Sequence, residues 1–263
     1  MTNSITGIVI TLNEEANIEE CLLNLKQVCN ELIVVDSNST DKTREIAEKV
    51  GAKVYIQSYL GDGFQKNVGL QYSSNKWVLS LDADERLTKE MVDEINKLDL
   101  NTTTFDAFGF RRRNMIGSRW IKRCGWYPDF CTRLYNKEKT KFKEVKQHSY
   151  VETKNVLNIK ADMIHYSFKS LSELFAKNGR PFASRGAKIL YQKGKKANSF
   201  TPFIHGLTSF IRHYFIKLGF LGGLDGLTVS VAAGVNAYIK YALLLEMQRD
   251  PKVLERTNFK SVW

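Results

Sequence analysis

The sequence predicts an α/β fold built on a mostly parallel sheet with helices on both faces. Apolar runs and helical patterns alternate along the first 100 residues, which is typical of a parallel sheet with crossover helices. The 43% hydrophobic content is enough for a sizeable core, and we find no internal repeat or low-complexity linker. A length of 263 residues fits one large domain, or one domain with an appendage.

The elements expected in the first 100 residues follow one another as strand and helix. Ile18, Leu22 and Leu25 share one helical face, and Gly51 is placed to end the second helix. Thr40 or Asp41 is placed to cap that helix, and Thr88 to begin another. The expected strands are residues 5–12, 32–35, 53–57 and 77–81, and the expected helices are residues 13–27, 40–50, 64–72 and a segment from 88 onward.

The pattern changes after residue 100. Short strand-like runs at 108–110, 131–135, 156–159 and 163–168 are separated by polar loops, and helical patterns return from Ser170. The sequence therefore predicts one domain over residues 1–168, with halves 1–100 and 101–168, and a basic, amphipathic helical region over 169–263.

The net charge of +11 is unevenly distributed. No acidic residue occurs between Glu173 and Asp225, an interval with nine Lys and Arg residues, and a second acid-free window spans 107–128. Such clusters indicate an anionic partner, namely a membrane surface, a nucleic acid or a phosphorylated substrate. The four cysteines form no CxxC pair, which argues against a zinc site or a disulfide framework. The first residues do not resemble a signal peptide, so we expect a cytoplasmic protein.

Asp82 and Asp84 follow the apolar run 77–81 directly. Ligands bind beyond the carboxyl ends of strands in open α/β sheets, so both carboxylates are expected at that edge. Two carboxylates fixed there suit Mg²⁺ or Mn²⁺ holding a diphosphate. The alternative is a solvated loop or a cap for the following helix.

Three more strand-end or helix-start segments carry polar residues. Thr11, Asn13 and Glu14 follow the first strand, where they could bind a base or ribose edge or complement a helix dipole. Asp36 ends the second strand and could accept from a nucleobase N–H or cap a helix. Lys66 could reach a phosphate or be an exposed helix lysine. The chain has no GxGxxG and no GxxxxGK[ST], which argues against dinucleotide and P-loop sites.

Asp129 ends the unusual aromatic turn 125–129. A carboxylate among aromatic neighbours can serve as a general base. The alternative is a structural turn in which Asp129 pairs with Arg133, four residues on.

An apolar stripe with helical spacing occupies the acid-free C-terminal interval. Its basic flanks are typical of a helix lying on anionic lipid, although such a stripe can also be core. The run 226–245 has the length of a membrane span, but we interpret it as a packed or interfacial helix. The stripe consists of Phe200, Phe203, Ile204, Leu207, Phe210, Ile211, Tyr214, Phe215 and Leu218.

Together these segments resemble the family-2 glycosyltransferases with the GT-A fold, a Rossmann-like sheet with a mixed-strand acceptor half. The resemblance rests on residues 8–15, 33–41, 61–67 and 77–86. Further segments resemble the lipopolysaccharide-core branch, which adds β-glucose to an inner-core heptose; these are residues 111–114, 117–120, 125–129, 133–135 and 164–167. Where that branch usually has a His-Glu pair, this chain has Gln147-His148-Ser149.

The resemblance implies a role for each matching residue. Residues 1–100 would bind the nucleotide sugar and 101–168 the acceptor. Asp129 would be the catalytic base, and His165 would be a metal or phosphate contact or a core histidine. Thr11, Asn13, Glu14 and Asp36 would line the uridine pocket, Lys66 would contact the nucleotide, Asp82 would touch ribose or metal, and Asp84 would ligate Mg²⁺ or Mn²⁺.

The expected function is therefore inverting transfer of a hexose, glucose by resemblance, from a UDP-sugar. The acceptor would be a membrane-linked glycan such as a lipooligosaccharide inner-core heptose. We expect a peripheral protein on the inner face of the cytoplasmic membrane, with no nucleic-acid partner. The alternatives are a metal-dependent nucleotidyltransferase and a non-enzymatic basic protein that binds membrane or nucleic acid.

Overall fold

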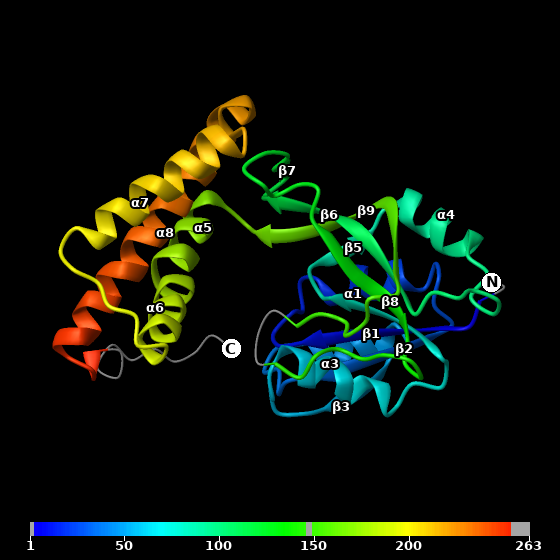
Figure 1. Cartoon of the computed structure of the whole chain (residues 1–263). Helices are drawn as coiled ribbons and strands as arrows, with labels where there is room; N and C mark the ends of the chain where they lie inside the picture. Colours follow the sequence, from blue (N-terminus) through cyan, green and yellow to red (C-terminus); the bar gives the residue numbers. More distant parts are fainter. Residues whose placement is uncertain (1–2, 146–148, 254–263) are drawn as a thin grey trace. The chain divides into compact units, whose positions relative to one another are not determined.

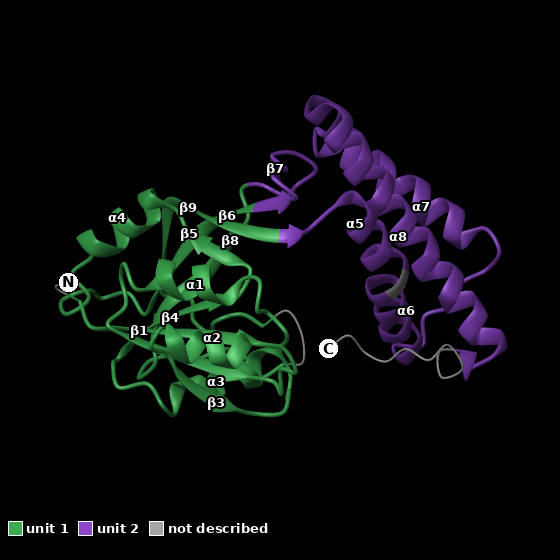
Figure 2. Cartoon of the chain, turned by 180° about the vertical axis from the view of Figure 1, so that it is seen from behind, with its two compact units in different colours: residues 1–113, 128–166 green, residues 114–127, 167–263 purple. Residues whose placement is uncertain are grey.

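The computed structural model describes residues 3–145 and 149–253, and its chain forms two compact units (Figures 1 and 2). Unit 1 comprises Met1–Arg113 and Pro128–Tyr166, and unit 2 comprises Asn114–Tyr127 and Ser167–Trp263. Residues 114–127, which the sequence-based division assigned to the half 101–168, thus group with the C-terminal helices.

One mixed sheet forms the centre of unit 1, in the order β3-β2-β1-β4-β8-β6-β9-β5, with β7 paired to β6. β1, β2, β3 and β4 are parallel, whereas β8 pairs antiparallel with β4 and with β6. The predicted α/β fold class, with a mostly parallel first half and a mixed second half, is confirmed. The strands are β1 (Ile5–Thr11), β2 (Glu31–Asp36), β3 (Lys53–Ile56), β4 (Trp77–Asp82), β5 (Glu85–Leu87), β6 (Ala107–Ile116), β7 (Arg119–Trp120), β8 (Phe130–Asn136) and β9 (Val156–Phe168).

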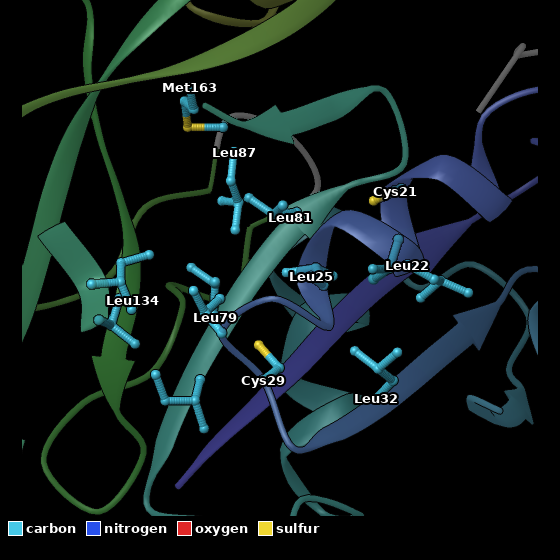
Figure 3. Close-up of a cluster of buried hydrophobic side chains, with 14 of the residues drawn as sticks. Cys21, Leu22, Leu25, Cys29, Leu32, Leu79, Leu81, Leu87, Leu134 and Met163 are labelled. Atoms are coloured by element: carbon cyan, nitrogen blue, oxygen red, sulfur yellow. The ribbon is translucent and has the colours of Figure 1, made fainter. Parts of the chain in front are cut away.

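Helices cover both faces of this sheet, because successive strand residues point to opposite sides. Leu79 and Leu81 pack in one buried cluster with Leu22 of a helix (Figure 3). The same cluster includes Val9 and, from another helix, Met91. Ile8, Val35 and Val78 pack in a second cluster, against Val68. The helices of unit 1 are α1 (Ile18–Leu25), α2 (Thr43–Lys49), α3 (Asp62–Leu70) and α4 (Lys89–Lys97).

Local chemistry sets the helix starts. Thr88 caps α4 as predicted, since its side chain accepts from the N–H of Met91 at 3.2 Å. The helix predicted from residue 13 begins only at Ile18, because Asn13 adopts a left-handed φ of 56° and Asn17 closes a turn onto the carbonyl of Glu14. The helix predicted from residue 40 begins at Thr43, where the Asp41 carboxylate accepts from the Thr43 N–H at 3.0 Å.

The predicted strands 156–159 and 163–168 are one continuous strand, β9. Residues 160–162 stay extended because the buried Asp162 between the two apolar runs is satisfied by arginines of β6. β9 pairs with β5, and β5 follows β4 in the chain after only Ala83 and Asp84. The sheet therefore curls, so that β5, at the end of the strand order, lies close to β4.

Unit 2 is helical, apart from β7 and the ends of β6 and β9. Its main feature is a hairpin in which α7 and α8 run antiparallel, since Ser209 bonds to Ala233 and Ala197 bonds to Gln248. Of the described residues, the stretch Gly219–Arg249 is long and apolar enough to cross a membrane. The helices are α5 (Leu171–Lys177), the π-helical η1 (Asn178–Phe182), α6 (Ala183–Gln192), α7 (Thr201–Ile211), the π-helical η2 (Arg212–Ile216), the 3₁₀ turn η3 (Gly219–Gly222) and α8 (Gly223–Arg249).

Candidate active site

The carboxyl ends of β1, β2 and β4 meet at one edge of the sheet. Thr11 is opposite Asp36 in the register of β1 and β2, and Ile10 is opposite Asp82 in the register of β1 and β4. The sequence predicted that polar strand-end residues would gather at this edge, and the parallel pairing brings Thr11, Asp36 and Asp82 together there.

Thr11 and Asp36 are buried and bonded to each other. The Thr11 hydroxyl donates to Asp36 Oδ2 at 3.0 Å, and the Ser39 N–H donates to Asp36 Oδ1 at 2.8 Å. Ser39 also accepts from the N–H of Asn13 at 2.8 Å. The two side chains therefore fix the loops after β1 and β2.

Asn13 and Glu14 lie nearer the solvent. Asn13 is exposed, and its Oδ1 accepts from the Thr40 N–H at 2.8 Å. Glu14 is half-buried, and its carboxylate accepts from the side-chain amide of Asn17 at 2.7 Å. Asn13 and Glu14 are therefore the more accessible members of the predicted uridine-binding set.

Lys66 is 3% exposed, so it is not the exposed helix lysine that the sequence left as an alternative. Its Nζ lies 2.9 Å from Asp62 Oδ1 and 3.1 Å from Asp82 Oδ1. Burial raises the pKa of Asp82, but Lys66 and Arg133 outweigh it and hold that pKa below its usual value. The pKa of Asp62 is likewise raised by burial and brought below its usual value by Lys66. A buried ammonium thus keeps two carboxylates ionised at this edge.

Glu85 lies between Asp82 and Asp129 in a network of hydrogen bonds and ion pairs. It is fully buried, its Oε2 accepts from the Asp82 N–H at 3.0 Å, and its Oε1 forms an ion pair with Arg133. Arg133 also reaches Asp82 Oδ2 at 3.1 Å, and Arg112 Nη1 lies 3.6 Å from Glu85 Oε1. We call Glu85, Arg133 and Arg112 the buried hub.

Asp129 pairs with Arg112 instead of Arg133, the partner that the sequence suggested. Nε and Nη2 of Arg112 donate to Asp129 Oδ2 at 2.9 and 2.7 Å. Arg133 is unavailable because it lies 6% exposed between Asp82 and Glu85. Asp129 is 33% exposed, so its carboxylate combines an oriented arginine contact with access from solvent.

Asp84 and His165 form a separate pair. Asp84 Oδ2 lies 3.4 Å from His165 Nε2, and the backbone of β9 holds the loop through the Tyr166 N–H and the Asp84 carbonyl, 3.0 Å apart. Adjacent ligands of an octahedral ion with bonds of about 2.1 Å lie about 3 Å apart, so these two atoms fit neighbouring positions on one divalent ion. Asp82 fits less well, because both of its oxygens already face cations. Among the described residues, no group of three His, Cys, Asp or Glu side chains could hold a metal.

The family model described as glycosyl transferase family 2 matches residues 6–165 of this chain. The chain belongs to glycosyltransferase family 2. It is therefore a transferase, and the family predicted from the sequence is confirmed.

This family-2 glycosyltransferase has relatives of nearly its own length. An uncharacterised glycosyltransferase of Rickettsia bellii is 32% identical over 259 residues, covering 94% of this chain and 88% of the relative. One of Rickettsia conorii is 31% identical, covering 99% and 96%. The lipopolysaccharide core biosynthesis glycosyltransferase LpsC of Rhizobium meliloti is 25% identical, covering 91% and 93%. Among solved structures, S. aureus TarS 1–349 in complex with UDP matches at 16% identity and a TM-score of 0.48, covering 95% and 92%.

The arginines of the acid-free window 107–128, which indicated an anionic partner, are partly engaged in ion pairs within the enzyme. Arg111 and Arg113 both pair with the buried Asp162, at 2.7 and 2.6 Å. Two cavities of about 470 and 420 Å³ lie at the opposite edge of the sheet, near the amino ends of the parallel strands, and no predicted site residue lines them.

From the sequence we did not identify Asp62 or Arg112 as partners of the predicted site residues. We also did not predict that Glu85 would be buried between Arg133 and Arg112. The helix predicted over residues 64–72 left Asp62 in the preceding turn, whereas α3 begins at Asp62, so the four-residue spacing brings Asp62 and Lys66 together. The Gln147-His148 part of the departure from the branch pattern lies outside the described residues. Ser149 is described, and its N–H and hydroxyl donate to Asp62 Oδ2 at 2.9 and 2.7 Å.

Proposed function

We propose that this enzyme moves a hexose, glucose by preference, from a UDP-sugar to a lipid-linked saccharide with inversion at the anomeric carbon. The observation that carries the proposal is the ion pair of Asp82 with the buried Lys66 at the carboxyl end of β4, two residues before Asp84, in a chain of family 2. We further propose that the acceptor resembles a lipooligosaccharide inner-core heptose and that the enzyme works on the inner face of the cytoplasmic membrane.

The donor half has a role for each predicted residue. Asn13 and Glu14 contact the uridine, while Thr11 and Asp36 hold the loops that present them. The ammonium of Lys66 turns from its carboxylate partners toward the diphosphate, since phosphate oxygens are strong acceptors for charged donors. Asp84 and His165 would hold Mg²⁺ or Mn²⁺, and Asp82 would contact the ribose or the ion. When bound, such an ion supplies Lewis acidity that stabilises the charge on the departing diphosphate.

Asp129 acts as the base. It removes the proton from an acceptor hydroxyl while that oxygen attacks the anomeric carbon on the face opposite the diphosphate, so one displacement inverts the configuration and needs no covalent intermediate. Arg112 orients the carboxylate through two bonds to a single oxygen. Glu85 is buried and ion-paired, which makes it a poor alternative base.

The acceptor proposal rests on the relative and on charge. LpsC is named for lipopolysaccharide core biosynthesis, and the net charge of +11 suits an acceptor that carries phosphate or carboxylate groups at an anionic surface. A nucleotidyltransferase would usually need a glycine-rich basic loop near the N-terminus, whereas residues 7–16 contain one glycine and no Lys or Arg.

A thermal-shift panel tests the donor proposal. We expect UDP-glucose with Mn²⁺ to raise the melting temperature more than UDP-glucose alone, and Asp84→Ala to lose the metal-dependent part. Glu138→Gln, an exposed carboxylate paired only at the surface with Lys76, is the control. Stabilisation by nucleoside triphosphates but by no UDP-sugar would favour the nucleotidyltransferase instead.

A further inference from the structure

The α7–α8 hairpin packs through small residues. A Cβ added to Gly206 would lie 3.3 Å from the carbonyl oxygen of Gly234, and one added to Gly234 would lie 3.1 Å from that of Gly206. The Ser209 hydroxyl donates to the carbonyl of Ala233 at 3.1 Å. Gly, Ala and Ser at these positions let the backbones of the two helices approach closely. Buried on the two helices are Pro202, Gly206, Gly226, Val229, Ser230, Ala232, Gly234, Leu244 and Met247.

The large apolar side chains of the hairpin point outward instead. On α7 the exposed fraction is 64% for Phe203 and 62% for Leu207, and on α8 it is 76% for Leu224. The rings of Phe203 and Tyr238 contact each other at 5.2 Å, so the stripes of the two helices lie on the same side. We call this surface the outer face: Phe200, Phe203, Ile204, Leu207 and Ile211 with Leu224, Leu227, Val231, Val235 and Tyr238.

An apolar surface of this extent marks a site of interaction, because single exposed apolar residues are normal but contiguous stripes are not. The chain from Thr201 to Ile211 contains no Asp, Glu, Lys or Arg. Leu224, Leu227, Val231, Val235 and Tyr238 recur at intervals of three or four residues, so the stripe on α8 is continuous as well.

Positive charges flank both ends of the outer face. Lys193, Lys195 and Lys196 are exposed just before α7, and Ala197 beside them exchanges two hydrogen bonds with Gln248 near the end of α8. Arg212 is exposed at the other end of α7. The acid nearest to that end in sequence, Asp225, pairs with Arg119 at 2.9 Å. An apolar surface between two cationic ends complements an anionic bilayer, with acyl chains beneath the face and headgroups at both ends.

We propose that the outer face docks into the interface of an anionic lipid bilayer, with the α7–α8 hairpin lying parallel to the membrane plane. This inference deepens the proposed function, on which it rests for the membrane-held acceptor. A second copy of the chain is a poorer occupant, because a two-fold contact that pairs the faces antiparallel brings Lys193–Lys196 of one copy onto Arg212 of the other. A spanning α8 is also disfavoured, since a Cβ on Gly186 of α6 would lie 2.7 Å from Lys240 Cδ, so α6 covers one side of α8.

Vesicle sedimentation with the full chain tests the proposal. We expect binding to phosphatidylcholine vesicles containing 30% phosphatidylglycerol, weaker binding in high salt, and release by alkaline carbonate. The substitutions Phe203→Asp and Leu207→Asp should together abolish binding, whereas Leu23→Asp, at a leucine of unit 1 that is 51% exposed, should leave it unchanged. Replacing Lys193, Lys195 and Lys196 by Glu should weaken binding about 100-fold or more, since each cation near an anionic leaflet contributes about fivefold.

Several results would overturn the proposal. The first is equal binding of the protein to vesicles with and without phosphatidylglycerol. The second is binding by the Phe203→Asp, Leu207→Asp variant at the wild-type level, and the third is vesicle-bound protein that alkaline carbonate does not release. Self-association in analytical ultracentrifugation that this variant abolishes, without any vesicle binding, would assign the outer face to a second copy. Because the UDP-sugar thermal shift is measured without lipid, vesicle binding without that shift would refute the proposed function alone, and the shift without vesicle binding would refute only the docking.

Discussion

Replacing Glu85 by Gln should destabilise unit 1 strongly, although the side chain keeps its shape. Glu85 is fully buried, and its carboxylate faces the guanidinium groups of Arg133 and Arg112. Two unit charges about 4 Å apart interact by about 4 kcal/mol at an effective dielectric constant of about 20. Breaking one partner of a buried pair typically costs about 3–5 kcal/mol.

The lower end of that range applies here, because Arg133 keeps Asp82 at 3.1 Å and Arg112 keeps Asp129 at 2.7 Å. We therefore expect a loss of about 3 kcal/mol in the free energy of unfolding, and a midpoint lowered by roughly 6–12 °C. Thermal and urea unfolding followed by circular dichroism measure both. Glu138→Gln breaks only an exposed pair with Lys76 and should cost less than about 1 kcal/mol. If the two variants unfolded alike, the buried hub would contribute no more than a surface ion pair.

Three further predictions concern the site. Asp84→Ala should abolish metal-dependent transfer in a UDP-glucose turnover assay while circular dichroism shows an intact fold; undiminished turnover, in this variant or in EDTA, would remove the metal role. Asp129→Asn should lower kcat about 10²–10⁴-fold and leave UDP-sugar binding by calorimetry unchanged; a loss below about tenfold with chemistry rate-limiting would move the base elsewhere. The folded-state pKa values of Asp62 and Asp82 lie below their usual values, so their contribution to stability is full above about pH 4 and is lost as the pH falls further. Lys66→Met should therefore shift acid unfolding to higher pH, and an unchanged acid transition would contradict the pairing.

The sequence could predict the parallel half of the fold because its signals are local. The apolar runs before Thr11, Asp36 and Asp82 identify strands, and parallel strands bring their carboxyl ends to one edge. It could not predict where the turn after β1 would give way to α1, because the left-handed conformation of Asn13 depends on hydrogen bonds to the loop 39–40.

The sequence also could not predict which charged residues pair with one another. Arg111, Arg112 and Arg113 read as one basic cluster, but on a strand their side chains alternate, so Arg112 joins Glu85 and Asp129 while its neighbours pair with Asp162. Asp129 and Arg133 are four residues apart, yet β8 is a strand and not a helix, so that spacing does not bring them together.

The return of β5 to β4 through Ala83 and Asp84 sets the order in which this protein can mature. β5 pairs with β9, which is encoded about 70 residues later, and β9 joins the sheet beside β6. Contacts so distant in sequence form slowly, because the intervening loops must close first. Asp84 and His165 therefore come together only when β9 has been added, so a chain still emerging from the ribosome would lack the pair that we propose as the metal site. The two-residue link also resists insertion: an added residue would displace β5 from His165 while leaving the rest of the sheet able to form.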